Sequence, residues 1–480
     1  MKKQIESVLL SGSLAELRKG ILDRELSVAE AANWYINRIE TCGTALNAVR
    51  SLSPQALDHA RQLDDDIAAG RVRGPLHGIP ILLKDNISTG DGLPMSAGSL
   101  ALAKFVPKRD ATIVQQLRRA GALILGKTNL TEFADYVSDV MPSGFSAVGG
   151  MVKNPQTMQE YGRGLGSSVG AAAAVAASLG PVAIGSETQN SIQTPASVSS
   201  VFGFKPSVGA VSCKGIVPLV PSQDAPGPLG RSIDDLALIL GVIAGGDSRD
   251  GQTLSGALQI RRPQGYRDPK SVRIGVPRRL IADRPDLEGL MPEFETTLSE
   301  LAKAGVTIVD PCDLPSAEQL HEVRSSVFRT EFKAALNAFL SENGSPCGIG
   351  SLDDLIRFNE REPSAIPFGQ SLLKLANNTD GLNDTTYISD RRRDIALSRH
   401  AGIDAALWFS EADVLIAPMG AAAKCTGKAG APVLAIPSGL NARGEPFGIT
   451  VFASFGSDTT VLEIGTTIAR IVGQRVTPAV

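Results

Sequence analysis

The sequence is poor in the residues that build disulfide frameworks and metal sites. Its five cysteines are widely spaced without a Cys-x-x-Cys pair, and its four histidines are scattered without a His-Glu-x-x-His motif. A disulfide framework, a cysteine zinc site and a histidine-ligated metal site are therefore excluded as organising features. We expect no metal and no other cofactor. The odd number of cysteines fits a reducing compartment, and we expect the cytoplasm.

An excess of charge and a long, fully apolar run are also lacking. The chain has 47 basic and 50 acidic residues, so we expect no nucleic-acid partner. Residues 164–186 are uncharged over about the length of a membrane span, but Ala, Ser, Gly and Pro181 make them far less apolar. Glu6 interrupts the short apolar run that a signal peptide requires. We expect no membrane association, and a monomer or homodimer.

The common phosphate-binding loops are missing as well. The glycines at 162, 164 and 166 do not complete a Gly-x-Gly-x-x-Gly motif, and residues 154–161 do not resemble a strand. Gly126-Lys127-Thr128 lacks the upstream glycine of a Walker loop. These absences argue against a dinucleotide site and against a P-loop.

What is present is an alternation of strand-like and helix-like segments, which predicts an α/β fold. Strands are predicted near residues 81–83, 122–125, 272–276, 306–309, 414–417, 433–436 and 449–452. Capping boxes at Ser13 and Ser27 begin two N-terminal helices, and residues 313–411 are mainly helical. The helix–strand rhythm favours a mostly parallel sheet, while residues 215–230 are rich in Pro and Gly.

No boundary is strong enough to separate folding units, so we expect a single domain over residues 1–480. Within it, residues 1–70 form a helical region and residues 75–245 hold the motifs described below. Residues 246–270 form a polar linker, and residues 271–480 resume the α/β pattern.

The segment from Arg163 to Pro206 is the most informative part of the chain. Its small residues let two backbones approach closely, and serines at Ser167 and Ser191 stand 24 residues apart at its two ends. Small-residue packing is one interpretation. A second is the nucleophile elbow, because residues 166–170 match Gly-x-Ser-x-Gly, but this motif needs a preceding strand and a late histidine. We expect a buried helix followed by a strand.

A serine can also be activated without histidine, by a lysine whose amine burial keeps neutral. Lys84 is the candidate, because it ends the short apolar run Ile81–Leu83 that is typical of a strand buried on both faces. Such a lysine is either a rim residue reaching outward or a desolvated amine with a lowered pKa.

These residues resemble the amidase signature family, serine hydrolases with a Ser–cis-Ser–Lys triad. The resemblance covers nearly the whole chain, and its motifs are residues 78–86, 126–134, the two serine clusters, 203–206 and 227–232. Residues 144–150, 184–188 and 222–224 look most like the bacterial peptide amidase branch. The resemblance implies a large mixed central β-sheet covered by helices on both faces. It also implies pocket walls built largely by the N-terminal helices and residues 313–411.

By this resemblance, Ser191 attacks an amide carbonyl and forms an acyl-enzyme. Ser167, held by a non-proline cis peptide bond, relays the proton to a neutral Lys84. The backbone N–H groups of Thr188, Gln189, Asn190 and Ser191 form the oxyanion hole. Ser143 and Gly144 help to position the substrate, and Ser168, Glu187 and Gln193 support the site from behind.

The nucleophile loop departs from the family pattern. Gln189 and Asn190 stand where the family usually has two glycines, which predicts a shifted loop, because glycine tolerates positive φ and close approach. Both amides would lie where the substrate binds and could help to recognise it. Glu187 and Gln193 replace the usual Asp and Arg, so their ion pair cannot form.

On the relay side, Leu165 and Val169 replace glycines beside Ser167 and narrow the site.

Three functions follow from this pattern. The first is an amidase that hydrolyses a linear carboxamide, either a peptide C-terminal amide or an aryl amide. The second is an acyl-transfer or amide-forming enzyme that uses the same acyl-enzyme. The third is a non-catalytic binding protein with the same fold, whose loop has lost the oxyanion geometry. The intact Lys84, Ser167 and Ser191 favour an enzyme. A tRNA-dependent amidotransferase subunit would share the fold, but its partner surfaces are not visible in the sequence.

Overall fold

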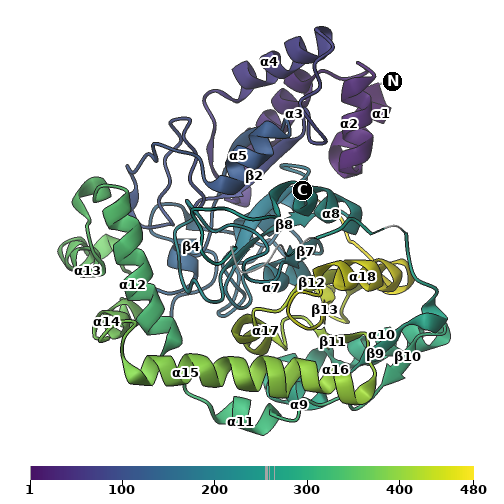
Figure 1. Ribbon diagram of the computed structural model, residues 1–480. Helices are drawn as coiled ribbons and strands as arrows, with labels where there is room; N and C mark the ends of the chain where they lie inside the picture. The colour runs from purple at the N-terminus through teal and green to yellow at the C-terminus, as the bar shows by residue number, and fades with distance from the viewer. Residues whose placement is uncertain (1, 254–257, 259, 264, 480) are drawn as a thin grey trace.

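A computed structural model describes residues 2–253, 258, 260–263 and 265–479 (Figure 1). Its centre is one eleven-stranded sheet to which both halves of the chain contribute. In sheet order the strands are β1 (Val49–Leu52), β3 (Leu123–Thr128), β2 (Pro80–Lys84), β6 (Ala183–Glu187), β8 (Ala225–Gly230), β7 (Phe202–Lys205), β12 (Val433–Leu440), β13 (Pro446–Phe452), β11 (Val414–Pro418), β9 (Arg273–Gly275) and β10 (Thr307–Val309). A separate small sheet pairs β4 (Phe145–Ser146) with β5 (Gly150–Met151).

Helices pack on both faces of the large sheet. In the first half they are α1 (Lys2–Ser11), α2 (Leu14–Leu22), α3 (Val28–Thr41), α4 (Ala56–Ala68), α5 (Thr112–Arg119), α6 (Val169–Ala176), α7 (Gln193–Val198) and α8 (Ile233–Ile243). In the second half they are α9 (Arg278–Ala282), α10 (Met291–Lys303), α11 (Ala317–Glu322), α12 (Val327–Glu342), α13 (Leu352–Arg361), α14 (Ser371–Asn377), α15 (Thr385–Ile395), α16 (Ala405–Ser410), α17 (Ala423–Ala429) and α18 (Asp458–Val472). Figure 1 shows α1–α4 gathered at one end and α12–α16 along another side. The expected large mixed sheet covered by helices is confirmed.

The prediction of a mostly parallel sheet was wrong. Six of the ten neighbouring strand pairs are antiparallel, and four are parallel. The alternation of helices and strands along the sequence does not indicate which strands of the sheet pair antiparallel. β12 and β13, for example, are joined by a short connection and pair antiparallel, and β7 and β8 also run antiparallel.

Strand β8 lies in the centre of the sheet although its sequence, Ala-Pro-Gly-Pro-Leu-Gly, argues against a strand. It was missed inside the Pro- and Gly-rich region. A Cβ at Gly227 would lie 2.0 Å from the Phe204 carbonyl oxygen of the neighbouring strand β7. Only glycine permits this close approach of the two backbones.

Two local predictions are confirmed by the structure. Ser13 and Ser27 each form a full capping box, with Glu16 and Glu30 as the partners. The small-residue segment forms the fully buried helix α6 followed by strand β6. A Cβ at Gly170 would lie 2.2 Å from the Asn129 carbonyl oxygen, so α6 packs directly against backbone, as the small residues predict.

The expected linker, residues 246–270, includes residues 254–257, 259 and 264, which lie outside the described residues.

Candidate active site

Lys84 is the last residue of β2, and its side chain is completely buried. β2 and β6 are parallel neighbours, so both strands end at the same edge of the sheet. Lys84 Nζ lies 2.6 Å from Ser167 Oγ and 3.1 Å from both the carbonyl oxygen and the hydroxyl of Ser186. The lysine therefore points inward and is not a rim residue.

Burial lowers the pKa of Lys84 to about 7, because the protonated amine has lost its hydration. Asp224, Glu187 and Asp135 oppose this shift through their charges, but no carboxylate of the described chain forms an ion pair with the lysine. A neutral amine has two N–H donors and one lone pair. The two oxygen atoms of Ser186 can accept both N–H groups, which leaves the lone pair for the Ser167 hydroxyl.

The structure brings Ser167 and Ser191 to the same place from different segments. The Ser168 backbone N–H donates a 3.1 Å hydrogen bond to the Ser191 carbonyl oxygen. A Cβ at Gly166 would lie 2.9 Å from Ser191 Cα, so the two chains are in backbone contact. Ser167 is fully buried and Ser191 is 4% exposed. Within the described ranges, Ser191 Oγ has no hydrogen-bond partner, and the Ser167 hydroxyl contacts Lys84 instead.

The cis peptide bond expected before Ser167 is not present in this structure. Asp310–Pro311 is the only cis peptide bond in the part of the chain that the structure describes. Trans is the lower-energy form of a peptide bond before any residue other than proline. The lysine–serine contact of 2.6 Å is formed with this backbone.

Residues 188–192 connect β6 to α7, and the first four of them are the residues expected to present backbone N–H groups. None of the N–H groups of Gln189, Asn190 and Ser191 donates a hydrogen bond to another described residue. Neither Gln189 nor Asn190 takes a positive φ, so the loop does not need the backbone freedom of glycine. The substitution of both family glycines is therefore accommodated without left-handed strain.

The side chains of these two residues tie the loop to its neighbours. Gln189 Nε2 donates to Gln223 Oε1 at 3.2 Å, and Asn190 Nδ2 donates to the Gly164 carbonyl at 2.7 Å. Thr188 Oγ1 donates to Asp224 Oδ1 at 2.5 Å. The loop is thus held from both sides.

Glu187 and Gln193 form a hydrogen-bonded pair where the family pattern has an ion pair. The buried carboxylate of Glu187 accepts the backbone N–H groups of Ile192 and Gln193 at 2.5 and 2.9 Å. It also accepts Gln193 Nε2 at 2.6 Å. Burial raises the pKa of Glu187, and these hydrogen bonds together with the charge of Lys205 oppose that shift. Glu187 and Gln193 form no ion pair, because Gln193 carries no charge. The hydrogen bond from the Gln193 amide to the Glu187 carboxyl takes its place.

The residues expected near the substrate shape the loop that carries Ser167. Ser143 Oγ accepts the Leu165 N–H at 3.0 Å and donates to Asp135 at 3.3 Å. The Gly144 N–H donates to Thr131 Oγ1 at 2.8 Å, and that hydroxyl donates to the Gly166 carbonyl at 3.0 Å. Ser143 is fully buried, so its hydroxyl positions the backbone.

The Ser168 side chain contacts Ser186, which is a partner of Lys84. Its hydroxyl donates to the Ser186 carbonyl at 3.1 Å, so it braces the residue that holds Lys84. No strand ends directly before the Gly-x-Ser-x-Gly match at residues 166–170 in the described chain, although a nucleophile elbow requires one.

Sequence reasoning did not assign roles to Ser186, Asn86 or Asp135. Asn86 Nδ2 donates to Ser186 Oγ at 2.9 Å, so both residues support Lys84. Asp135 is partly buried near the lysine, and the loss of hydration raises the pKa of this carboxyl to about 7. The sequence positions of Asn86, two residues after Lys84, and of Ser186, near the end of strand β6, could have indicated their roles. The sequence around Asp135 contains no pattern that would place it near Lys84.

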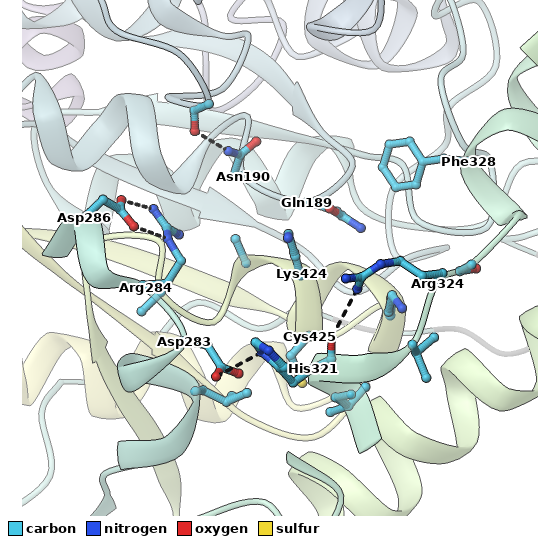
Figure 2. Close-up of a pocket in the computed structure, with 18 of the residues that line it drawn as sticks. Gln189, Asn190, Asp283, Arg284, Asp286, His321, Arg324, Phe328, Lys424 and Cys425 are labelled. Carbon is cyan, nitrogen blue, oxygen red and sulfur yellow. Dashed lines mark hydrogen bonds and ion pairs between the residues drawn. The ribbon is translucent and has the colours of Figure 1, made fainter. Parts of the chain in front are cut away.

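A cleft of about 920 Å³ begins at the nucleophile loop (Figure 2). Gln189 and Asn190 line it, as does Leu165, one of the residues that replace a glycine beside Ser167. Its other walls come from residues 280–286, 320–329 and 421–428. Within residues 313–411, the segment 320–329 lines this cleft. None of the described lining residues comes from the N-terminal helices.

No group of three or more His, Cys, Asp or Glu side chains among the described residues is arranged to hold a metal ion. None of the described helices is both long and apolar enough to span a membrane.

Comparisons with known proteins agree on one family. Residues 30–429 match the Amidase family. The structure of the native peptide amidase from Stenotrophomonas maltophilia has a TM-score of 0.88 and 36% identity, with 97% of this chain and 98% of that chain covered. A probable amidase from Arabidopsis thaliana is 32% identical over 94% of this chain and 88% of its own length. A glutamyl-tRNA(Gln) amidotransferase component from Nitrosomonas europaea is 30% identical over 95% of this chain and 96% of its own length.

Proposed function

Because this chain belongs to the amidase family and is an amidase hydrolase, we propose that it hydrolyses a linear carboxamide through an acyl-enzyme on Ser191. The observation that carries this proposal is the contact between the buried Lys84 amine and Ser167, at 2.6 Å. Burial lowers the pKa of Lys84 to about 7, and its amine contacts a serine hydroxyl, which is the arrangement a base requires. The buried amines of Lys127 and Lys205 contact backbone carbonyls instead.

In the first half of the proposed reaction, Ser191 Oγ forms a bond to the amide carbonyl carbon. Its proton passes to Ser167, and the Ser167 proton passes to Lys84 Nζ. The N–H groups of Gln189, Asn190 and Ser191, which have no acceptor among the described residues, stabilise the oxyanion. Each such donor is worth about 3 kcal/mol in comparable enzymes.

In the second half, the carbon–nitrogen bond breaks and the leaving amine takes the proton back from Lys84 through Ser167. Water then attacks the acyl-enzyme, with Lys84 again accepting the proton through the same relay. The carboxylic acid leaves and Ser191 regains its hydrogen. The direct Ser167–Ser191 hydrogen bond is a requirement of this scheme that forms on substrate binding, since catalytic hydrogen bonds often tighten only then.

We further propose that the substrate is a peptide C-terminal amide. The support is the 36% identity with a peptide amidase over nearly the whole chain. A second support is the size of the cleft, about 920 Å³, which is at the upper end for small-molecule sites and suits an acyl group of several residues.

The test is the intact mass of the protein after incubation with a fluorophosphonate, run beside release of ammonia from an N-acetylated tripeptide amide. We expect one adduct on Ser191 in the wild type. The adduct and the ammonia release should both be lost in Ser191→Ala and in Lys84→Ala.

Three results would count against the proposal. Labelling that moves to Ser168 in Ser191→Ala would support the nucleophile elbow. Labelling without ammonia release, but with transfer of the acyl group to an added amine, would support acyl transfer. A folded wild type that takes no label would support a non-catalytic binding protein.

A further inference from the structure

The cleft next to the nucleophile loop is strongly basic although the chain as a whole is slightly acidic. The net charge of the sequence is −3. Two aspartates line the cleft, Asp283 and Asp286, against six basic side chains, which are Arg163, Arg284, Arg324, Arg329, Lys424 and Lys428. The local excess of positive charge is therefore a property of this site and not of the composition.

The acidic neighbours neutralise only part of this charge. Asp286 pairs with Arg284 at 2.6 Å, and Asp283 pairs with His321 at 3.1 Å. Lys428 is paired from behind by Asp394, at 2.8 Å. These pairs account for both cleft aspartates.

Four cations of the cleft remain without an ion pair to any described residue, and they are Arg163, Arg324, Arg329 and Lys424. Arg324 donates one hydrogen bond of 3.3 Å to the His321 carbonyl, and Arg163 donates one of 3.5 Å to the Asp139 carbonyl. Their guanidinium groups thus keep most of their donors free. Cations gathered in a concave, partly apolar site attract anions more strongly than the same cations on an open surface.

These cations line the same cleft as Gln189 and Asn190 of the nucleophile loop. Lys424 is on α17, and a Cβ at Gly427 of the same helix would lie 2.6 Å from Gln189 Cγ, so α17 packs on the nucleophile loop. Arg324 and Arg329 flank the start of α12, where Phe328 lines the same cleft. In Figure 2, Arg324 and Lys424 reach toward the same part of the cleft, near Gln189.

We propose that this cleft selects substrates whose acyl part carries an anionic group, and that the group is the carboxylate of an acidic peptide side chain. The inference rests on the proposed hydrolysis of a primary amide. In that reaction the leaving group is ammonia, so every other group of the substrate belongs to the acyl part. An anionic group of the substrate that binds in the cleft, beyond Gln189 and Asn190, therefore belongs to the acyl part of that substrate. Arg324 and Lys424 are the specificity-determining residues, because a carboxylate binds well to guanidinium and ammonium groups.

Binding is measured with the Ser191→Ala protein, so that the result does not depend on turnover. The probes are N-acetylated, C-terminally amidated tripeptides that differ at one position, which carries glutamate, glutamine, lysine or phosphoserine. The glutamate peptide is expected to bind about tenfold more tightly than the glutamine peptide, and the lysine peptide most weakly. The preference for glutamate should shrink at about 0.5 M salt, because salt screens partly exposed charges.

Substitutions locate the selective residues. Arg324→Gln and Lys424→Gln should each reduce the glutamate-over-glutamine preference several-fold, and the double variant should abolish it. Arg119→Gln is the matched control. Arg119 is an exposed arginine of α5 that does not line the cleft, so its loss should leave the preference unchanged.

The outcomes separate this inference from the proposed hydrolysis. Equal binding of the glutamate and glutamine peptides at every tested position, with ammonia still released by the wild type, would overturn anion selection alone. A phosphoserine peptide that binds far more tightly than the glutamate peptide would replace the carboxylate by a phosphate. A glutamate preference that survives in the Arg324→Gln/Lys424→Gln variant would overturn the assignment of these residues.

Discussion

Gln193 Nε2 donates a 2.6 Å hydrogen bond to Glu187 Oε1, so the two residues that flank the proposed nucleophile are joined without an ion pair. The other carboxylate oxygen of Glu187 holds the backbone N–H groups of Ile192 and Gln193. One buried side chain therefore fixes the turn between Ser191 and α7. Burial raises the pKa of this carboxyl, and the charge of Lys205 together with these hydrogen bonds opposes that shift.

Replacing this carboxylate should damage both stability and activity. Glu187→Ala leaves the backbone N–H groups of Ile192 and Gln193 without an acceptor and removes one of the two hydrogen bonds of Gln193 Nε2. We expect a loss of about 3 kcal/mol or more in the free energy of unfolding. The rate constant for amide hydrolysis should fall at least about tenfold, because the loop that carries Ser191 is released. Urea unfolding and kcat, measured on the same preparations, check both effects. Unchanged stability would show that Glu187 does not hold the loop.

The rate of hydrolysis should depend on the protonation of Lys84. Since only the neutral amine can accept a proton, kcat/KM should rise with pH and reach half of its plateau near pH 7, where the pKa of Lys84 lies. The measurement is a pH profile with an uncharged peptide amide. A flat profile between about pH 5.5 and 9 would exclude Lys84 as the titrating base.

Asp135 provides the control for this profile, because burial also brings its pKa to about 7. Its negative charge raises the pKa of Lys84. In Asp135→Asn the step should therefore persist and move to lower pH. Disappearance of the step in this variant would assign the titration to the carboxyl.

The glycine at the start of α6 should tolerate no side chain. In Gly170→Ala the added Cβ would lie 2.2 Å from the Asn129 carbonyl oxygen and 2.8 Å from that of Ala48. Neither carbonyl group can move away easily, because both belong to the main chain. We therefore expect the free energy of unfolding to fall by about 2 kcal/mol or more. Ser167 lies three residues before this position and should be displaced, with a lower rate of fluorophosphonate labelling at Ser191.

Gly241→Ala is the matched helix substitution. Apart from its chain neighbours and the backbone of its own helix, no described atom lies within 4 Å of a Cβ at Gly241 in α8. Alanine should therefore raise the free energy of unfolding by about 0.5–1 kcal/mol. Equal effects of the two substitutions on thermal unfolding would contradict the close packing of α6.

Restoring the family glycine at Asn190 should not improve the enzyme. Asn190 has no positive φ, and its Nδ2 holds the Gly164 carbonyl at 2.7 Å. Asn190→Gly should therefore lower kcat a few-fold and lower stability by about 1 kcal/mol, because the loop loses a hydrogen bond and gains backbone freedom. A rise in kcat would show that the asparagine impairs the oxyanion hole.

The sequence by itself determined the local features that depend on neighbouring residues. An apolar run that ends in lysine placed Lys84 at the end of a buried strand. The serine–glutamate spacings at Ser13 and Ser27 predicted two helix starts. An uncharged run of small residues predicted the buried helix α6 and the strand after it. In each case, the signal and the structure lie within one short segment.

The tertiary structure alone decided which distant segments meet. It placed Ser186 and Asp135 around Lys84, set the antiparallel pairs of the sheet, and made a central strand of β8 despite its two prolines. It also assembled the basic cleft from residues 163, 324, 329 and 424. Charge and packing act between side chains that are close in space. A sequence pattern records only neighbours along the chain, so these contacts leave no periodic signal in it.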